Sequence, residues 1–534
     1  MRGSERVQPD ARNVPGTAAG FVCRSLERQG MRFGLSRPAR SITGIAMLCA
    51  AVPVQATPAA DRIAWANRLT WGATAADLSE SVGPGSERWL DAQLHGPPAE
   101  LPPAAAAQIA QMRISREPLA QIVVEQQAMQ RDANALADPE QKKAARDAYQ
   151  KSMNALANEA RTRSILRDLY APDQLREQMT WFWFNHFNVQ AQKRDIRAMV
   201  GDYEDVIRAH AFGHFRDLLE ATLRHPAMLR YLDNDQNAAG HINENYAREI
   251  MELHTMGVGA GYTQQDVQEL ARILTGVGVD LKPDAPRLRP QLQPLYLRAG
   301  LFEFNPARHD FGEKHFLGHV IRGTGYAEVE QALDLIAAAP ATAHHVSAQI
   351  ATFFMGDAPP PALVDRMAQT FQHSHGDIAQ VMRVMIRSPE FAASLGKAFK
   401  DPIHYAISAV RLTYGDRVIL NAQPVINWLN RMGQGSYNHE TPDGYDLHSA
   451  AWSGPGQMAT RFDIARQIGG GAYGLFRAPD AKADLPAFPQ LQNALYFNGL
   501  QDTLAQPTRA ALAQANTPQE WNGLFLSSPE FMHR

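Results

Sequence analysis

Apolar residues recur with the period of an α-helix along almost the whole chain, and this pattern predicts a mainly helical protein. Two long helical patterns, over 115–136 and 140–170, are separated by a short segment in which Asp138 can cap a helix that begins at Pro139. We therefore expect a long helical hairpin over 115–170. Its composition fits either a solvated pair of helices or a partner-binding arm.

Alternation of apolar and polar residues is confined to one short region. It begins at 301–305 and, with the turn-rich stretch that follows, predicts a small β-hairpin inserted over 300–321. Thr263 and Asp266 have the spacing of a capping box, so a helix should begin there. We expect one large multi-helical domain over 61–534 that carries this β-hairpin.

The composition excludes several classes of protein. With 45% hydrophobic and 20% charged residues, the 534-residue chain is globular rather than disordered. Its formal net charge of -3 argues against a nucleic-acid partner. Because no Gly-x-Ser-x-Gly, His-Glu-x-x-His or Walker motif is present, serine hydrolases, zincins and nucleotide-binding proteins lose support.

The first 56 residues have the features of an export signal. A basic leader from Met31, an apolar run over 41–54 and a small residue at Ala56 predict a signal peptide over 31–56, cleaved before Thr57. We interpret residues 1–30 as an upstream extension produced by an early start-codon assignment. The mature protein should be periplasmic or secreted, and no later stretch is apolar enough for a transmembrane segment.

Both cysteines of the chain, Cys23 and Cys49, precede the predicted cleavage point. The mature chain would therefore contain no disulfide and no cysteine-based catalytic or zinc site.

The segment 181–188 (WFWFNHFN) carries aromatic side chains all round a helix, which predicts that protein encloses it on every side. Asn185 and His186 should then be buried, and a buried polar group without a partner costs about 1–3 kcal/mol. They either tie neighbouring helices together or line an aromatic-walled pocket in which His186 could transfer protons or bind a metal.

A second polar segment follows at 233–257. Asp233, Asp235, Asn237 and Glu244 have the spacing of calcium ligands in an EF-hand, but Ala238 stands where that loop needs glycine. We therefore expect these side chains to cap the following helix, with Asn243 accepting bonds from its first-turn amides. We expect no metal and no cofactor.

The predicted helix from Asn243 places Glu244, Arg248 and Glu252 on one stripe, with Glu249 alongside and His254 facing away. This stripe is either a solvated face with ion pairs four residues apart, or a carboxylate cluster that Arg248 neutralises and that works as acid and base. The adjacent His309 and Asp310 could likewise supply a base and its orienting partner.

Several of these segments together resemble a known family. The segments are 243–257, 261–263, 266–276, 68–74, 184–187, 309–318 and 528–531. They resemble the bacterial domain of unknown function 1800 (DUF1800), and the resemblance covers nearly the whole chain from about residue 61. One departure is Ala339, where the family often has histidine before the proline. The resemblance implies an exported bacterial protein, often encoded beside a sulfatase-like exported partner of the DUF1501 type, and it supplies no reaction.

With this resemblance, the polar positions predict a pocket. Catalytic roles are expected for Glu249, Glu252, His186 and Arg248. Substrate-binding roles are expected for Asn185, Asp233, Asn234, Asn243, Glu244, Asn245, His309 and Asp310. The first hypothesis is an extracytoplasmic enzyme, a hydrolase of an envelope or polymeric substrate that uses a glutamate as general acid or base. The alternative is a non-catalytic binding or assembly partner of the sulfatase-like protein.

Overall fold

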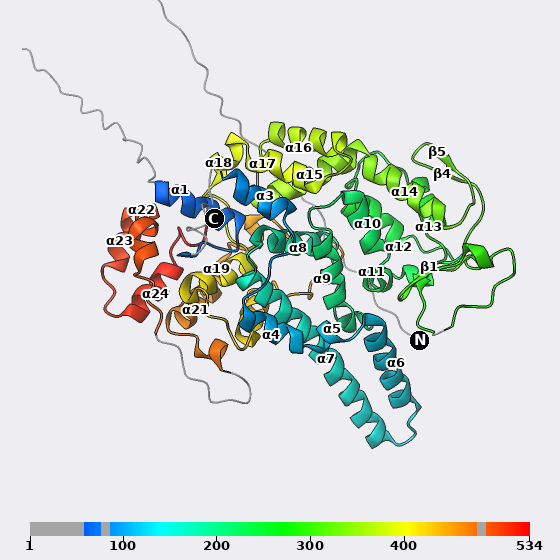
Figure 1. Cartoon of the computed structure of the whole chain (residues 1–534), viewed down its shortest axis with the longest axis horizontal. Helices are drawn as coiled ribbons and strands as arrows, with labels where there is room; N and C mark the ends of the chain where they lie inside the picture. The colour runs from blue at the N-terminus through cyan, green and yellow to red at the C-terminus, as the bar shows by residue number, and fades with distance from the viewer. Residues whose placement is uncertain (1–57, 76–85, 283, 478–487) are drawn as a thin grey trace, which may run out of the picture. The chain divides into compact units, whose positions relative to one another are not determined.

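The computed structural model describes residues 58–75, 86–282, 284–477 and 488–534, and helices dominate these ranges, as the periodicity predicts (Figure 1). The first helices are α1 (Pro58–Leu69), α3 (Glu87–His95), α4 (Pro103–Gln111), α5 (Arg113–Arg116), α6 (Leu119–Ala135) and α7 (Pro139–Tyr170). They are followed by α8 (Gln174–His186), α9 (Val200–Ala209), α10 (Phe215–Leu223), α11 (Pro226–Tyr231), α12 (Asn245–Glu249) and α13 (Gln264–Ile273).

The remaining helices come after the sheets. They are α14 (Tyr326–Ala338), α15 (Pro340–Met355), α16 (Pro361–His373), α17 (Ile378–Ile386), α18 (Pro389–Ser394), α19 (Pro402–Tyr414), α20 (Gln423–Arg431), α21 (Pro455–Gly469), α22 (Gln501–Thr503), α23 (Gln506–Leu512) and α24 (Pro518–Leu526). Within the described ranges, no helix has the length and apolar character needed to cross a membrane. The predicted signal peptide and upstream extension lie outside the described residues.

The helical hairpin consists of α6 and α7, which pack against each other. The Asp138 carboxylate accepts a hydrogen bond from the Gln141 amide (2.8 Å) and Pro139 occupies the first turn of α7, so the predicted cap is confirmed. The inner turns of α7 are buried, whereas most side chains near the turn between the helices are exposed. The hairpin is shorter at its start than predicted, because 113–116 forms the separate helix α5.

The predicted β-hairpin is part of a larger arrangement. β1 (Val277–Val279), β3 (Phe302–Phe304) and β2 (Leu297–Ala299) form an antiparallel sheet in that order, with Val277 and Leu297 both opposite Phe304. A second antiparallel pair joins β4 (Lys314–Phe316) to β5 (His319–Ile321). The prediction of one hairpin over 300–321 therefore missed part of the β-structure. Three-residue strands are too short to show an alternating pattern in the sequence.

Protein surrounds α8, as its aromatic pattern predicts. Phe182, Trp183 and Phe187 are at most 1% exposed. The helix packs against α3, α7 and α9, and its rings contact Phe353 of α15 and Phe215 of α10. Because α8 ends at His186, Asn185 and His186 lie in its last turn, and Asn188 follows the end of the helix.

The predicted helix from Asn243 changes character halfway. α12 is followed directly by a π-helical turn, η3 (Ile250–His254), and the Gly257 amide then donates to the Met251 carbonyl oxygen (3.2 Å). π-Helical turns are frequent at functional sites. Here the wider turn brings Leu253 and His254 to the end of α8.

Candidate functional site

Asn185 and His186 line a cavity of about 360 Å³. Its walls come from the end of α8, from η3, from α15 and from the loop over 439–448. The lining residues are Phe182, Asn185, His186, Leu253, His345, Gln349, His439, Asp443, Gly444, Tyr445, Asp446, Leu447 and His448. Cavities of roughly 300–1,000 Å³ are typical of small-molecule sites.

Two asparagines of the aromatic motif hold the loop in place. The Asn185 side chain donates to the Tyr445 carbonyl oxygen (2.9 Å) and accepts from the Tyr445 amide (2.7 Å). Asn188 donates to the carbonyl oxygens of His439 (3.2 Å) and Thr441 (2.7 Å). Gly444 has φ of +71°, and a Cβ there would lie 2.1 Å from the Asn185 carbonyl oxygen, so this close approach requires glycine.

His186 lies between these asparagines and bonds to η3. Its Nε2 donates to the His254 carbonyl oxygen (2.9 Å), and His345 Nε2 donates to the Leu253 carbonyl oxygen (3.3 Å). Each ring therefore keeps an unprotonated Nδ1. Burial, with a smaller contribution from the His345 imidazole, lowers the pKa of His186 to about 3, and burial also lowers the pKa of His345. Both imidazoles are neutral at physiological pH.

His254 faces away from the carboxylate stripe, as the helical pattern predicts. It is 1% exposed, its ring packs on Phe187 (centroids 5.0 Å apart), and neither ring nitrogen has a hydrogen-bond partner among the described residues. Burial and the imidazoles of His186 and His345 lower its pKa, so this third histidine is neutral as well.

Glu249 lies about one turn before Leu253 and is half-buried. Burial and the negative charges of Glu252 and Asp443 raise its pKa, although Arg248 opposes the shift. Asp443 is a lining residue of the cavity, and its carboxylate accepts a hydrogen bond from Thr441 Oγ1 (2.5 Å) and contacts His439 Nε2 (3.1 Å). The Asp443 charge therefore contributes to the raised pKa of Glu249, although Glu249 is not among the described lining residues of the cavity.

Arg248 belongs to a partly exposed row of ion pairs along the helix. It pairs with Glu244 (3.2 Å) and Glu252 (3.3 Å) and donates to the Gln264 side chain (2.8 Å). This arrangement matches the solvated-face interpretation of the stripe, and such pairs contribute only about 0.3–0.5 kcal/mol each.

The polar residues before this helix stabilise the loop. Asp233 pairs with Lys193 (2.8 Å), and Asn234, which is fully buried, donates to the carbonyl oxygens of Leu274 (3.3 Å) and Val277 (2.9 Å). The Asn243 side chain accepts from the amide of Asn245 (3.0 Å), as predicted.

Two further polar contacts stabilise this loop. Asn245 donates to the Leu232 carbonyl oxygen (3.2 Å), and Asp235 pairs with Arg194 (2.8 Å). Among the described residues, no group of three or more His, Asp, Glu or Cys side chains is placed to hold a metal ion.

His309 and Asp310 lie in a different part of the fold. The His309 ring bonds to the Thr275 carbonyl oxygen (2.8 Å) and to Glu328 (2.8 Å), and Lys314 pairs with the same carboxylate. The His309, Glu328 and Lys314 side chains are fully buried, and Asp310 pairs with Arg272 (2.9 Å). Neither His309 nor Asp310 lines the cavity at His186.

Sequence reasoning missed most of the cavity wall. His345 and Gln349 come from α15, and His439, Asp443, Asp446 and His448 come from one loop. Two histidines and two aspartates within ten residues of that loop were a usable signal, since such residues cluster at functional sites. For α15 the sequence gives no such signal, because its contact with η3 depends on tertiary packing.

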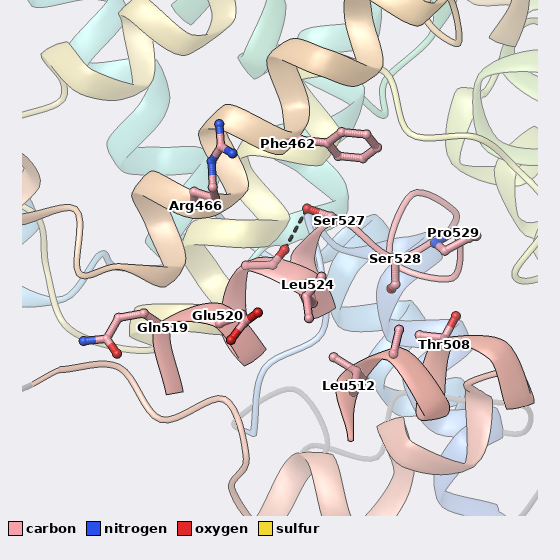
Figure 2. Close-up of a pocket in the computed structure, with 12 residues that line it drawn as sticks. Phe462, Arg466, Thr508, Leu512, Gln519, Glu520, Leu524, Ser527, Ser528 and Pro529 are labelled. Atoms are coloured by element: carbon pink, nitrogen blue, oxygen red, sulfur yellow. Dashed lines mark hydrogen bonds between the residues drawn. The ribbon is translucent and has the colours of Figure 1, made fainter. Parts of the chain in front are cut away.

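Figure 2 shows a larger cavity, of about 460 Å³, between α21, α23 and α24. Its walls are mainly apolar, and its charged residues have partners: Arg466 pairs with Asp463, and Glu520 accepts from the Asn516 amide (2.8 Å). No histidine is among its described lining residues. The cavity at His186 is therefore the better candidate for acid–base chemistry.

The chain belongs to the family described as "Protein of unknown function (DUF1800)", whose model matches residues 64–533. No curated protein and no solved structure matches the chain.

Proposed function

We propose that this protein is an exported hydrolase whose catalytic centre is the cavity at His186. The observation that carries the proposal is that Asp443, in the wall of a cavity with four histidines, contributes to the raised pKa of the half-buried Glu249. Hydrolysis by general acid and base needs one carboxyl group that holds a proton near neutral pH and one that is ionised. A raised pKa suits Glu249 for the acid, and Asp443 would activate water.

The lining residues indicate the substrate class. Neutral His186 and His345 offer hydrogen-bond acceptors, Gln349 offers an amide, and Phe182 and Tyr445 offer aromatic surface. Hydroxyl-rich segments of an envelope polymer present donors and an apolar ring face that such a wall would bind. We therefore expect a glycan-like substrate before an anionic one, because Asp443 and Asp446 would repel anions.

Screening the full mature chain against glycan, ester and phosphoester libraries tests the proposal. Turnover should fall by roughly 10²-fold or more in Glu249→Gln, which removes the acid while keeping its shape. The exposed Glu330→Gln substitution is the matched control and should leave turnover unchanged. Turnover that Glu249→Gln does not reduce, or no turnover on any library, would count against the hydrolase.

A second function, assembly with a sulfatase-like exported partner, is supported by the α6–α7 hairpin. Its outer turns are exposed, and Lys142 and Arg146 bond across to Asn134, so the arm is ordered without burial in the rest of the fold. Replacing residues 130–146 by a short turn should abolish co-purification of the partner. Unchanged recovery of the partner would exclude the hairpin as the binding arm.

A further inference from the structure

A third cavity, of about 160 Å³, lies beside four buried basic side chains. Those side chains are Arg68, Lys400, Arg461 and Arg534, each at most 4% exposed. None of the four forms an ion pair with a described residue, and the three guanidinium groups donate mainly to backbone carbonyl oxygens. Buried charges are normally paired, and the Asp401 carboxylate offsets only part of this positive charge, so the remaining excess needs a physical explanation.

Lys400 and Arg534 are the members of this group that line the cavity. Lys400 is 2% exposed, and its ammonium group has no hydrogen-bond partner among the described residues, its closest recorded contact being the Phe531 ring (3.8 Å to the centroid). Burial, with the charges of Arg534 and Arg461, lowers the pKa of Lys400 well below its usual value. An anion in the cavity would reverse this effect, because it would stabilise the protonated amine.

Two further polar groups line the same space, and one of them presents a donor. The Asn67 side chain uses its oxygen to accept from the Ala73 amide (2.9 Å), which leaves its NH₂ group for a ligand. His533 donates from Nδ1 to the Pro529 carbonyl oxygen (2.7 Å), so its Nε2 is an acceptor and offers no bond to an anion.

The nearby carboxylates are already engaged. Glu530, which also lines the cavity, accepts from the Ala505 amide (2.9 Å) and from Thr508 (2.9 Å). Asp401 bonds to His404 (2.6 Å), and its negative charge offsets part of the positive charge of Arg461 and Arg534.

The other walls are apolar and include Ile63, Leu500, Leu504 and Phe525. A cavity of about 150 Å³ holds a benzene-sized molecule. One cationic end and apolar sides suit a carboxylate that carries a small apolar group better than they suit a fully polar oxyanion such as phosphate. We propose that this cavity binds a small apolar monocarboxylate, of the size of butyrate or benzoate, through Lys400 and Asn67.

Calorimetric titration of the full mature chain with benzoate and butyrate tests this proposal. Binding should be accompanied by proton uptake rather than release, measured by comparing buffers of different ionisation enthalpy, because an anion beside Lys400 raises the pKa of its amine. Lys400→Met should weaken binding by roughly tenfold or more. Lys397→Met, an exposed lysine three residues away, should leave the affinity unchanged.

Asn67→Asp provides an independent test that keeps the bond to Ala73. It retains the acceptor oxygen and replaces the donor by a negative charge, so it should also weaken binding by roughly tenfold or more. Equal affinity for benzyl alcohol and benzoate, preference for inorganic phosphate, absence of binding, or binding unaffected by both variants would each overturn the proposal. Circular dichroism of each variant shows whether the fold is kept.

Discussion

At the scale of single residues, the segment 185–188 has two structural roles, which are to hold the 439–448 loop and to contact η3. Asn185 and Asn188 hold the 439–448 loop through its backbone, while His186 between them reaches η3. A buried asparagine can do this because its amide both donates and accepts, which matches a backbone peptide group. The shape of the cavity therefore depends on hydrogen bonds that no apolar side chain could replace.

Asn185→Ala should lower the free energy of unfolding by about 2–3 kcal/mol, because it leaves the amide and carbonyl of Tyr445 without partners. Urea denaturation measures the change. The control, Asn245→Ala, removes one bond at an exposed position and should cost about 1 kcal/mol or less. Equal losses in the two variants would contradict the role given to Asn185.

At the scale of elements, the transition from α12 to η3 positions the histidines. The turn closes at Gly257, which has φ of +90°, and a Cβ there would lie 3.1 Å from His345 Nδ1. The glycine thus allows both the left-handed turn and the close approach of α15.

Gly257→Ala should destabilise the fold by about 1–3 kcal/mol and displace the His345 ring. Gly259 is the matched control, because it also has positive φ (+76°) but a Cβ there would have no neighbour within 4 Å. Gly259→Ala should therefore strain the backbone without moving His345. Histidine ring resonances in NMR spectra report the difference, and an unperturbed His345 in Gly257→Ala would refute this explanation.

Elements with local signals were predictable from the sequence. The capping box at Thr263, confirmed by mutual bonds with Asp266, and the Asp138 cap need only neighbouring residues. The π-helical turn and the approach of His345 were not predictable, because they arise where α8, α12 and α15 pack together. For the same reason the sequence indicated Asn185 and His186 but grouped them with His309 and Asp310, which lie in another buried network.

At the scale of the whole molecule, four segments distant in sequence enclose several neutral histidines. Burial lowers the pKa of His186 to about 3 and that of His404 to about 4, and it also lowers the pKa values of His254 and His345. In the unfolded chain each would titrate near 6.5. Below that pH the unfolded state binds protons that the folded state does not bind, so acid favours unfolding.

The free energy of unfolding should therefore be steady above about pH 7.5 and fall as the pH drops below about 6.5, by about 1.4 kcal/mol per pH unit for each such histidine. Urea denaturation at several pH values from about 7.5 down to about 5 measures the slope. His345→Gln should make this dependence on pH less steep, whereas His344→Gln, at an exposed neighbouring position, should not. Identical slopes in both variants would show that His345 titrates normally in the folded protein.

The central claim is that Glu249 and Asp443 form an interacting acid–base pair at the cavity, and the pKa of Glu249 tests it most directly. NMR titration of side-chain ¹³C-labelled glutamate, assigned with Glu249→Gln, measures this pKa in the full mature chain. We predict a value above the ordinary glutamate value of about 4.3 that falls toward it in Asp443→Asn. An ordinary pKa that Asp443→Asn leaves unchanged would contradict the account.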